Sequence, residues 1–164
     1  MARRLTRALG FVALINYLGL IAIGALVLGP AGAAPPDLMV TGYGVAEIEG
    51  YLAGLAGVTD IWPLAVALLD TIFPICLGLF LALLAFRWNR GALAWAAALA
   101  ALAYMGADLG ENWLIRAFAA GAPVTEPAVR FTAQVTMAKF ALLAVAVLLL
   151  AVSGRRGRAR ARAN

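Results

Sequence analysis

Histidine is absent from this 164-residue chain. Imidazole ligation of haem, Ser-His or Cys-His catalysis, and most zinc or copper sites all need histidine, so its absence excludes these chemistries. Cysteine occurs once, at Cys76 in an apolar run, which excludes a disulfide within the chain and favours an inert buried thiol. Lysine also occurs once, at Lys139, and the other cations are arginines. We therefore expect no cofactor and no metal site.

Apolar residues are abundant instead, at 65% of the chain, whereas a soluble domain is nearer half. A chain of this length could not hide so much apolar surface in water, so we expect a lipid bilayer around it. Four stretches are long enough to cross a hydrocarbon core of about 30 Å, which takes about 20 helical residues. They lie at about 8–29, 62–86, 91–119 and 128–152. The sequence predicts an all-α polytopic membrane protein, a four-transmembrane-helix bundle forming a single membrane domain over 1–164.

The charges predict the orientation of the spans. Ten of the basic residues precede the first span, form the turn between the second and third spans, or belong to the tail 153–164: Arg3, Arg4, Arg7, Arg87, Arg90, Arg155, Arg156, Arg158, Arg160 and Arg162. The remaining segments hold the acids Asp37, Glu47, Glu49, Asp60 and Glu126. The positive-inside rule then puts both termini in the cytoplasm, in a multi-pass protein of the cell (inner) membrane. We expect no nucleic-acid partner, because neither aromatic residues nor a fold signature accompany these arginines.

The first span has a second interpretation. MARRLTR, an apolar run and then AGAAPP also resemble a signal peptide with a cleavage site at 31–33. The apolar run of 22 residues over 8–29 exceeds the usual signal-peptide core, and it holds Asn16 and Tyr17. We favour a retained helix; cleavage would leave three spans.

The external segment 30–61 begins with a Pro/Gly/Ala linker. In VAEIEGYLAGLAGV, residues 45–58, the apolar residues recur at helical spacing, which predicts a short amphipathic helix on the outer membrane surface or over the bundle. VTGYG, residues 40–44, resembles the potassium-filter sequence TVGYG. Its first two residues are in swapped order, and the prolines before it exclude a pore helix, so we interpret it as a glycine-rich turn.

Polar residues interrupt three of the spans at a similar depth. Asp108, Glu111 and Asn112 are spaced i, i+3, i+4 and share one face of the third span. Asp70 lies in the second span, and Lys139 in the fourth with Thr136 on its face. At 1.5 Å per residue, the four ionisable groups lie roughly 12–16 Å from the outer edge. Charges at such a depth should face inward and pair, so we predict a buried polar cluster of Asp70, Asp108, Glu111, Asn112 and Lys139.

The cluster has three carboxyl groups and one ammonium group. The excess of negative charge could be balanced in three ways. One or two carboxyls could keep their protons, Arg116 or Arg130 could reach down from the outer ends of the spans, or a cation could bind. An ammonium can lose its proton on burial whereas a guanidinium cannot, so a lone Lys139 suits a switchable site.

A structural role is the other interpretation, because polar networks also hold membrane helices together. Gly106-x-x-x-Gly110 offers a close-packing face, either within the chain or between copies. Pro74 leaves the main-chain carbonyl of Asp70 without its helical donor, so a neighbour must satisfy it.

The segments LLDTIFP and ADLGENWLI, followed by a lone lysine, resemble a group of small four-helix bacterial membrane proteins. Those carry an Asp-Phe-x-x-Pro-like motif, then Asp-x-x-Glu-Asn, then Lys. The matching positions are Asp70, Pro74, Asp108, Glu111, Asn112 and Lys139, although Thr71 and Ile72 separate Asp70 from Phe73 and depart from the first motif. The resemblance covers most of the chain and implies the topology and these residues. It implies no activity, because the group is uncharacterised.

Three functions follow as hypotheses. The first is a proton- or cation-linked transport or carrier component that uses the cluster. The second is a structural or assembly subunit, working as a homo-oligomer or with a membrane partner subunit. The third is a membrane enzyme acting on a lipid-soluble substrate, for which the sequence offers no evident nucleophile or phosphate loop.

Overall fold

The computed structural model describes residues 2–36, 39–58, 66–88 and 91–163, and the regular elements in these ranges are all helical, as the sequence predicts. In chain order they are α1 (Ala2–Ile23), the π-helical turn η1 (Gly24–Leu28), α2 (Val45–Ala56), α3 (Ala67–Trp88), α4 (Ala92–Ala119) and α5 (Glu126–Ala163).

Four of the helices are long and apolar enough to cross a membrane: Arg3–Leu28, Ala67–Trp88, Ala92–Ala119 and Glu126–Arg155. They agree with the four predicted spans. Several residues of the predicted layout lie outside the described ranges: 62–65 at the start of the second span, 89–90 in the turn, and the acids Asp37 and Asp60. The basic tail that follows the fourth predicted span belongs to the same helix, since α5 continues to Ala163.

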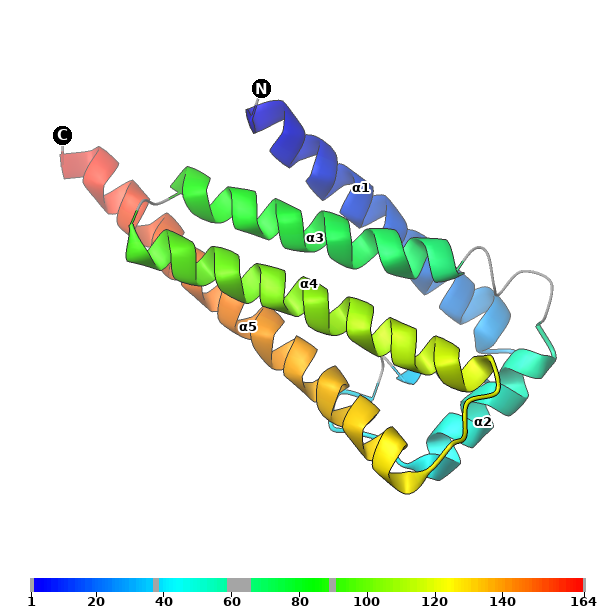
Figure 1. Ribbon diagram of the computed structural model, residues 1–164. Coiled ribbons are helices and arrows are strands. Elements are labelled where there is room, and N and C mark those ends of the chain that lie inside the picture. The colour runs from blue at the N-terminus through cyan, green and yellow to red at the C-terminus, as the bar shows by residue number, and fades with distance from the viewer. Residues whose placement is uncertain (1, 37–38, 59–65, 89–90, 164) are drawn as a thin grey trace.

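Helices α3, α4 and α5 form the tightly packed part of the molecule, and their core is built mainly from small residues. It consists of Leu81, Ala82, Ala85, Ala97, Ala98, Ala101, Ala146 and Leu150. Gly78 lets α3 approach α4 closely, since a Cβ added there would lie 2.7 Å from Cβ of Met105. Short side chains at a crossing allow close backbone packing without a hydrophobic driving force. Both termini lie at the same end of the molecule (Figure 1).

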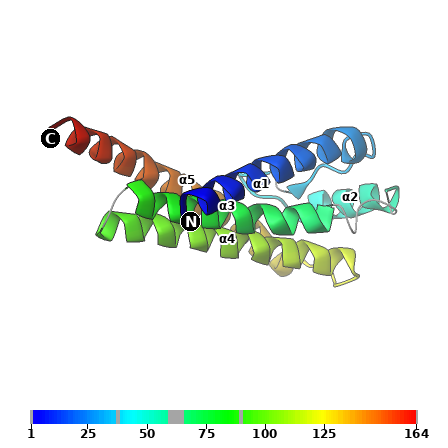
Figure 2. The ribbon, with the colours of Figure 1, turned by 90° about the horizontal axis from the view of Figure 1, so that it is seen from above.

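Helix α1 stands apart from this packed group and lies mainly against α3. Gly10 receives the ring of Phe80, and Gly19 receives Leu69. In Figure 2 the C-terminal end of α1 separates from α4. Large apolar side chains on α1, such as Phe11 and Leu14, are consequently exposed.

Helix α2 covers the end of the molecule opposite the termini (Figure 1). It buries Ile48, Tyr51 and Leu55, and Gly54 lies against Ala33 with no room for a side chain. The carboxylate of Glu47 accepts a hydrogen bond of 2.8 Å from the main-chain N–H of Gly44 and caps the helix. The predicted short helix is therefore present over Val45–Ala56, and its position outside a membrane stays a prediction.

The VTGYG segment forms the expected turn. The N–H of Gly42 bonds to the carbonyl of Met39 at 2.9 Å, and Gly42 has φ of +103°, which favours glycine. The turn lies against α5, since a Cβ at Gly42 would be 3.5 Å from Sδ of Met137. This geometry sets Tyr43 beside α5.

Candidate functional site

The polar residues of α4 lie on its buried face. Relative exposures are 5% for Asp108, 0% for Glu111 and 3% for Asn112. The i, i+3, i+4 spacing gives them one face of the helix, and that face is enclosed between α3 and α5. Three polar side chains with almost no contact with solvent must find partners within the protein.

Lys139 of α5 provides the counter-charge. Its Nζ lies 3.1 Å from Oδ1 of Asp108 and forms a closer ion pair with Oε2 of Glu111. The lysine itself is 4% exposed, and its ammonium lies 5.3 Å from the ring centroid of Phe140. One cation thus bridges two carboxylates one helical turn apart.

Hydrogen bonds extend this ion-pair network at both ends. Thr136 of α5 donates from its hydroxyl to Oε1 of Glu111 at 2.5 Å, and Tyr43 lies 3.0 Å from the same hydroxyl. At the other end, Tyr104 donates to Oδ2 of Asp108 at 2.8 Å. A continuous chain of polar groups therefore runs from the segment before α2 to the middle of α4.

Asn112 connects the cluster to α3. Its side-chain N–H donates to the main-chain carbonyl of Asp70 at 2.8 Å. Pro74, four residues later in α3, has no N–H for that carbonyl, so the amide replaces the missing helical hydrogen bond. The requirement predicted from Pro74 is confirmed, and Asn112 has a structural function whatever else it does.

The remaining predicted residues lie in different surroundings. Arg116 donates to the carbonyl of Ala67 at 2.9 Å and to the hydroxyl of Thr71 at 2.8 Å, two residues that lie on either side of Asp70 in α3. Arg130 is exposed on α5, and among the described residues no hydrogen bond or ion pair links it to the cluster.

The glycine pair of α4 does not pack within the described part of the chain. A Cβ added at Gly106 or at Gly110 would meet nothing within 4 Å. Close packing of this glycine pair within one chain is therefore not observed among the described residues, and packing between copies stays a prediction. Gly78 on α3 makes the close α3–α4 contact instead.

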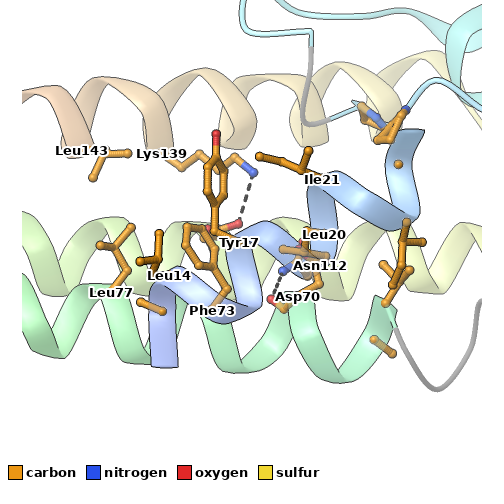
Figure 3. Close-up of a pocket in the computed structure, with 18 of the residues that line it drawn as sticks. Leu14, Tyr17, Leu20, Ile21, Asp70, Phe73, Leu77, Asn112, Lys139 and Leu143 are labelled. Carbon is orange, nitrogen blue, oxygen red and sulfur yellow. Dashed lines mark hydrogen bonds and ion pairs between the residues drawn. The ribbon is translucent and has the colours of Figure 1, made fainter. Parts of the chain in front are cut away.

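A cavity of about 1290 Å³ lies between α1 and the α3–α4–α5 group. Most of its lining is apolar, and four residues of the predicted cluster, Asp70, Asp108, Asn112 and Lys139, line its wall. Side chains from α1, α3 and α5 point into it (Figure 3). Ligand pockets usually hold about 300–1,000 Å³, so this space suits a large apolar molecule.

Within the described ranges, no three Asp, Glu or Cys side chains come close enough together to hold a metal ion. Asp108 and Glu111 meet around the ammonium of Lys139.

No protein-family model, curated protein or solved structure matches the chain. The resemblance based on the short motifs is therefore without support from these comparisons. The site has to be interpreted from its own geometry.

The sequence analysis missed three features of the site: Tyr104, Tyr43 and the cavity. Tyr104 precedes Asp108 by four residues, so helical spacing alone could have placed it on the same face. Tyr43 belongs to a turn whose contact with α5 no local pattern indicates. The cavity depends on the tilt of α1, which follows from packing rather than from hydropathy.

Proposed function

We propose that the chain is a multi-pass protein of the cell membrane, with both termini cytoplasmic, that works as a proton-linked carrier. The observation that carries this proposal is Glu111, a carboxylate without exposed surface that is bound by Lys139 and connected through Thr136 to Tyr43. A transport role also needs space for a substrate, and the adjacent cavity of about 1290 Å³ offers it.

Charge balance supports a proton at this site. Asp70, Asp108 and Glu111 carry three formal negative charges. Lys139 and Arg116, which bonds to residues on either side of Asp70, carry two positive charges, so the net is one negative charge (−3 + 2 = −1). An uncompensated charge at membrane depth costs at least about 2.5–3.5 kcal/mol. A carboxyl that keeps its proton avoids this cost, and it can release the proton when another positive charge arrives.

The hydrogen-bond chain supports a route for that proton from the outer side. If the Thr136 hydroxyl donates to Glu111, its oxygen is free to accept from the hydroxyl of Tyr43. All donors then point toward the carboxylate, which is the arrangement that proton transfer along hydroxyl groups requires. Tyr43 is only half-buried and so connects the chain to the surroundings of α2.

An assembly subunit is the second candidate, and the glycine pair favours it. Gly106 and Gly110 present an uncovered small-residue surface on α4, which a second copy or a partner subunit could cover. No observation of comparable weight favours an enzyme.

Infrared spectroscopy of the purified protein in lipid nanodiscs tests the proton site directly. We expect a band from protonated carboxyl groups near neutral pH that changes in Glu111→Gln or Asp108→Asn. The matched control is Glu126→Gln, which removes an exposed carboxylate at the start of α5 and should leave the band unchanged. A spectrum with no protonated carboxyl band sensitive to Asp70, Asp108 or Glu111 would refute the proposal.

A further inference from the structure

We propose that the cavity holds one acyl chain of an anionic phospholipid, with the lipid phosphate bound at Arg7. The lipid belongs to the leaflet at the end of the molecule where both termini lie, which is the cytoplasmic leaflet in the topology proposed above (Figure 1). The inference goes beyond the proton site, and it does not depend on the protonation of any carboxyl.

The half of the cavity nearer the termini has an apolar wall. In Figure 3, Leu14, Leu77 and Leu143 lie together, on the opposite side of Lys139 from Asp70. These leucines come from α1, α3 and α5, so three helices enclose the space. We call this half of the cavity the inner groove, and its defining residues are Arg7, Phe11, Leu14, Leu77 and Leu143.

The inner groove has the depth of one lipid leaflet. Arg7, Phe11 and Leu14 are spaced i, i+4, i+7, so they share one face of α1. The next large lining residue of α1 is Tyr17, which stacks on Phe73 at 5.6 Å. From Arg7 to Tyr17 the helix rises about 15 Å, which is half of a hydrocarbon core of about 30 Å. An acyl chain that begins at Arg7 therefore ends near the polar cluster.

The inner groove is open to the surrounding lipid. Phe11 and Leu14 line it, and yet they are 64% and 53% exposed. Apolar walls that face an unfilled space lose dispersion contacts, and a flexible acyl chain from the bilayer can restore them without exposing any polar group. The shape and the lining of the groove thus favour a lipid chain over a rigid or polar molecule.

The charge at the mouth of the groove favours an anionic headgroup. Within the described residues, no hydrogen bond or ion pair engages the guanidinium of Arg7. The eight acids of the chain all follow residue 36, and the two that line the cavity, Asp70 and Asp108, belong to the polar cluster. The counter-ion of Arg7 must therefore come from another molecule.

A phosphate fits this mouth better than a single carboxylate does. Arg3 precedes Arg7 by one helical turn, so both guanidinium groups start from the same face of α1, and both residues are exposed. Guanidinium groups bind phosphate oxygens through paired, charge-assisted hydrogen bonds. An anionic phospholipid brings this phosphate together with the acyl chain that the groove accepts.

The lipid leaves room for a substrate. At about 1290 Å³ the whole cavity is larger than the usual ligand pocket of about 300–1,000 Å³. One acyl chain in the inner groove leaves the other half, beside Asp70 and Asn112, open. The bound chain would then form part of the wall between α1 and α5.

Native mass spectrometry of the purified full-length protein in a neutral detergent tests the proposal. The protein is titrated with dioleoylphosphatidylglycerol and, separately, with dioleoylphosphatidylcholine, which has the same chains and no net charge. We expect the first phosphatidylglycerol to bind at least about fivefold more tightly than the first phosphatidylcholine. Oleate at the same concentration should not displace it.

Variants locate the site. Arg7→Gln should weaken binding of the first phosphatidylglycerol about fivefold, whereas Arg87→Gln, at an exposed arginine of α3 that does not line the cavity, should leave it unchanged. Leu14→Trp should weaken it about five- to tenfold, because the larger side chain fills the groove. The matched control is Leu18→Trp, at a leucine of α1 that is 51% exposed and lies outside the cavity lining.

The comparison of the two lipids on the unaltered protein does not depend on whether the variants fold. Equal binding of the two lipids, or displacement by oleate, would overturn the proposal. So would equal effects of Arg7→Gln and Arg87→Gln, which would assign binding to basic residues in general, or an unchanged affinity in Leu14→Trp. None of these outcomes bears on the carboxyl band that depends on Glu111, so the two proposals can fail separately.

Discussion

Lys139 and Glu111 form an ion pair in which the side chains are 5% and 0% exposed. Asp108 contacts the same ammonium at 3.1 Å, so removal of the lysine leaves two buried carboxylates facing one another. Removing one partner of a buried pair costs far more than the pair contributes, because the remaining charge is unsolvated. Stability of the cluster should therefore depend on its charge balance more than on any single contact.

Lys139→Met should lower the free energy of unfolding in detergent by about 3–5 kcal/mol. The double variant Lys139→Met/Glu111→Gln should recover much of that loss, because it restores the original formal charge of the cluster. Denaturation followed by circular dichroism measures both. Arg130→Met, which removes an exposed cation from the same helix, is the control and should change stability by less than about 1 kcal/mol. Additive losses in the double variant would show that Lys139 and Glu111 do not interact.

Asn112→Leu should destabilise the protein by about 1–3 kcal/mol, because the carbonyl of Asp70 loses its donor inside the protein. The cost should shrink in a Pro74→Ala background, where residue 74 regains an N–H that can reach that carbonyl. A double-mutant cycle from unfolding in detergent measures this coupling. Equal costs of Asn112→Leu in both backgrounds would mean that the hydrogen bond contributes nothing to stability.

Much of the helical layout could be predicted because hydropathy and span length act locally along the chain. The shared face of Asp108, Glu111 and Asn112 follows from helical geometry alone, and the need for a donor at Asp70 follows from Pro74. These arguments require only the positions of residues along single helices.

What the sequence could not supply depends on contacts between distant segments. The bond from Tyr43 to Thr136 joins residues 93 positions apart, across a turn whose conformation is set by Gly42. The close helix contact of a single glycine could not be predicted for the same reason. Among the described residues, a Cβ at Gly106 or Gly110 would meet nothing within 4 Å, whereas the isolated Gly78 makes the close contact with α4.

Gly78→Ala should destabilise the bundle by about 1–3 kcal/mol, because the added methyl group meets Met105 and the carbonyl of Ala101, at 2.7 and 3.1 Å. Gly106→Ala is the matched change on the facing helix, and it should stabilise the monomer by about 0.5–1 kcal/mol through helix propensity. Unfolding in detergent compares the two.

The same Gly106→Ala variant tests self-association. If α4 packs against a second copy through Gly106 and Gly110, the added methyl group should weaken the dimer, which analytical ultracentrifugation in detergent detects. A sedimentation profile that is unaltered at every protein concentration would argue against this face as the contact between copies.

Tyr43→Phe tests the proposed route of the proton. The change removes the hydroxyl group that bonds to Thr136, one step from Glu111 along the chain, so the fraction of protonated carboxyl at equilibrium should change little. The rate should change, because Glu111 has no exposed surface and the chain through Thr136 then lacks its outer donor. After a pH jump, time-resolved infrared spectroscopy should show the carboxyl band responding at least about tenfold more slowly, since a positioned proton donor typically contributes a hundredfold or more.

Thr136→Val removes the direct bond to Glu111 and should alter both the rate and the equilibrium. Tyr17→Phe, which removes a hydroxyl from the cavity wall, is the control and should alter neither. An unchanged rate in Tyr43→Phe would mean that the proton reaches the acids through the cavity between α1 and α3, and that the Tyr43–Thr136 contact serves only to fix the turn against α5.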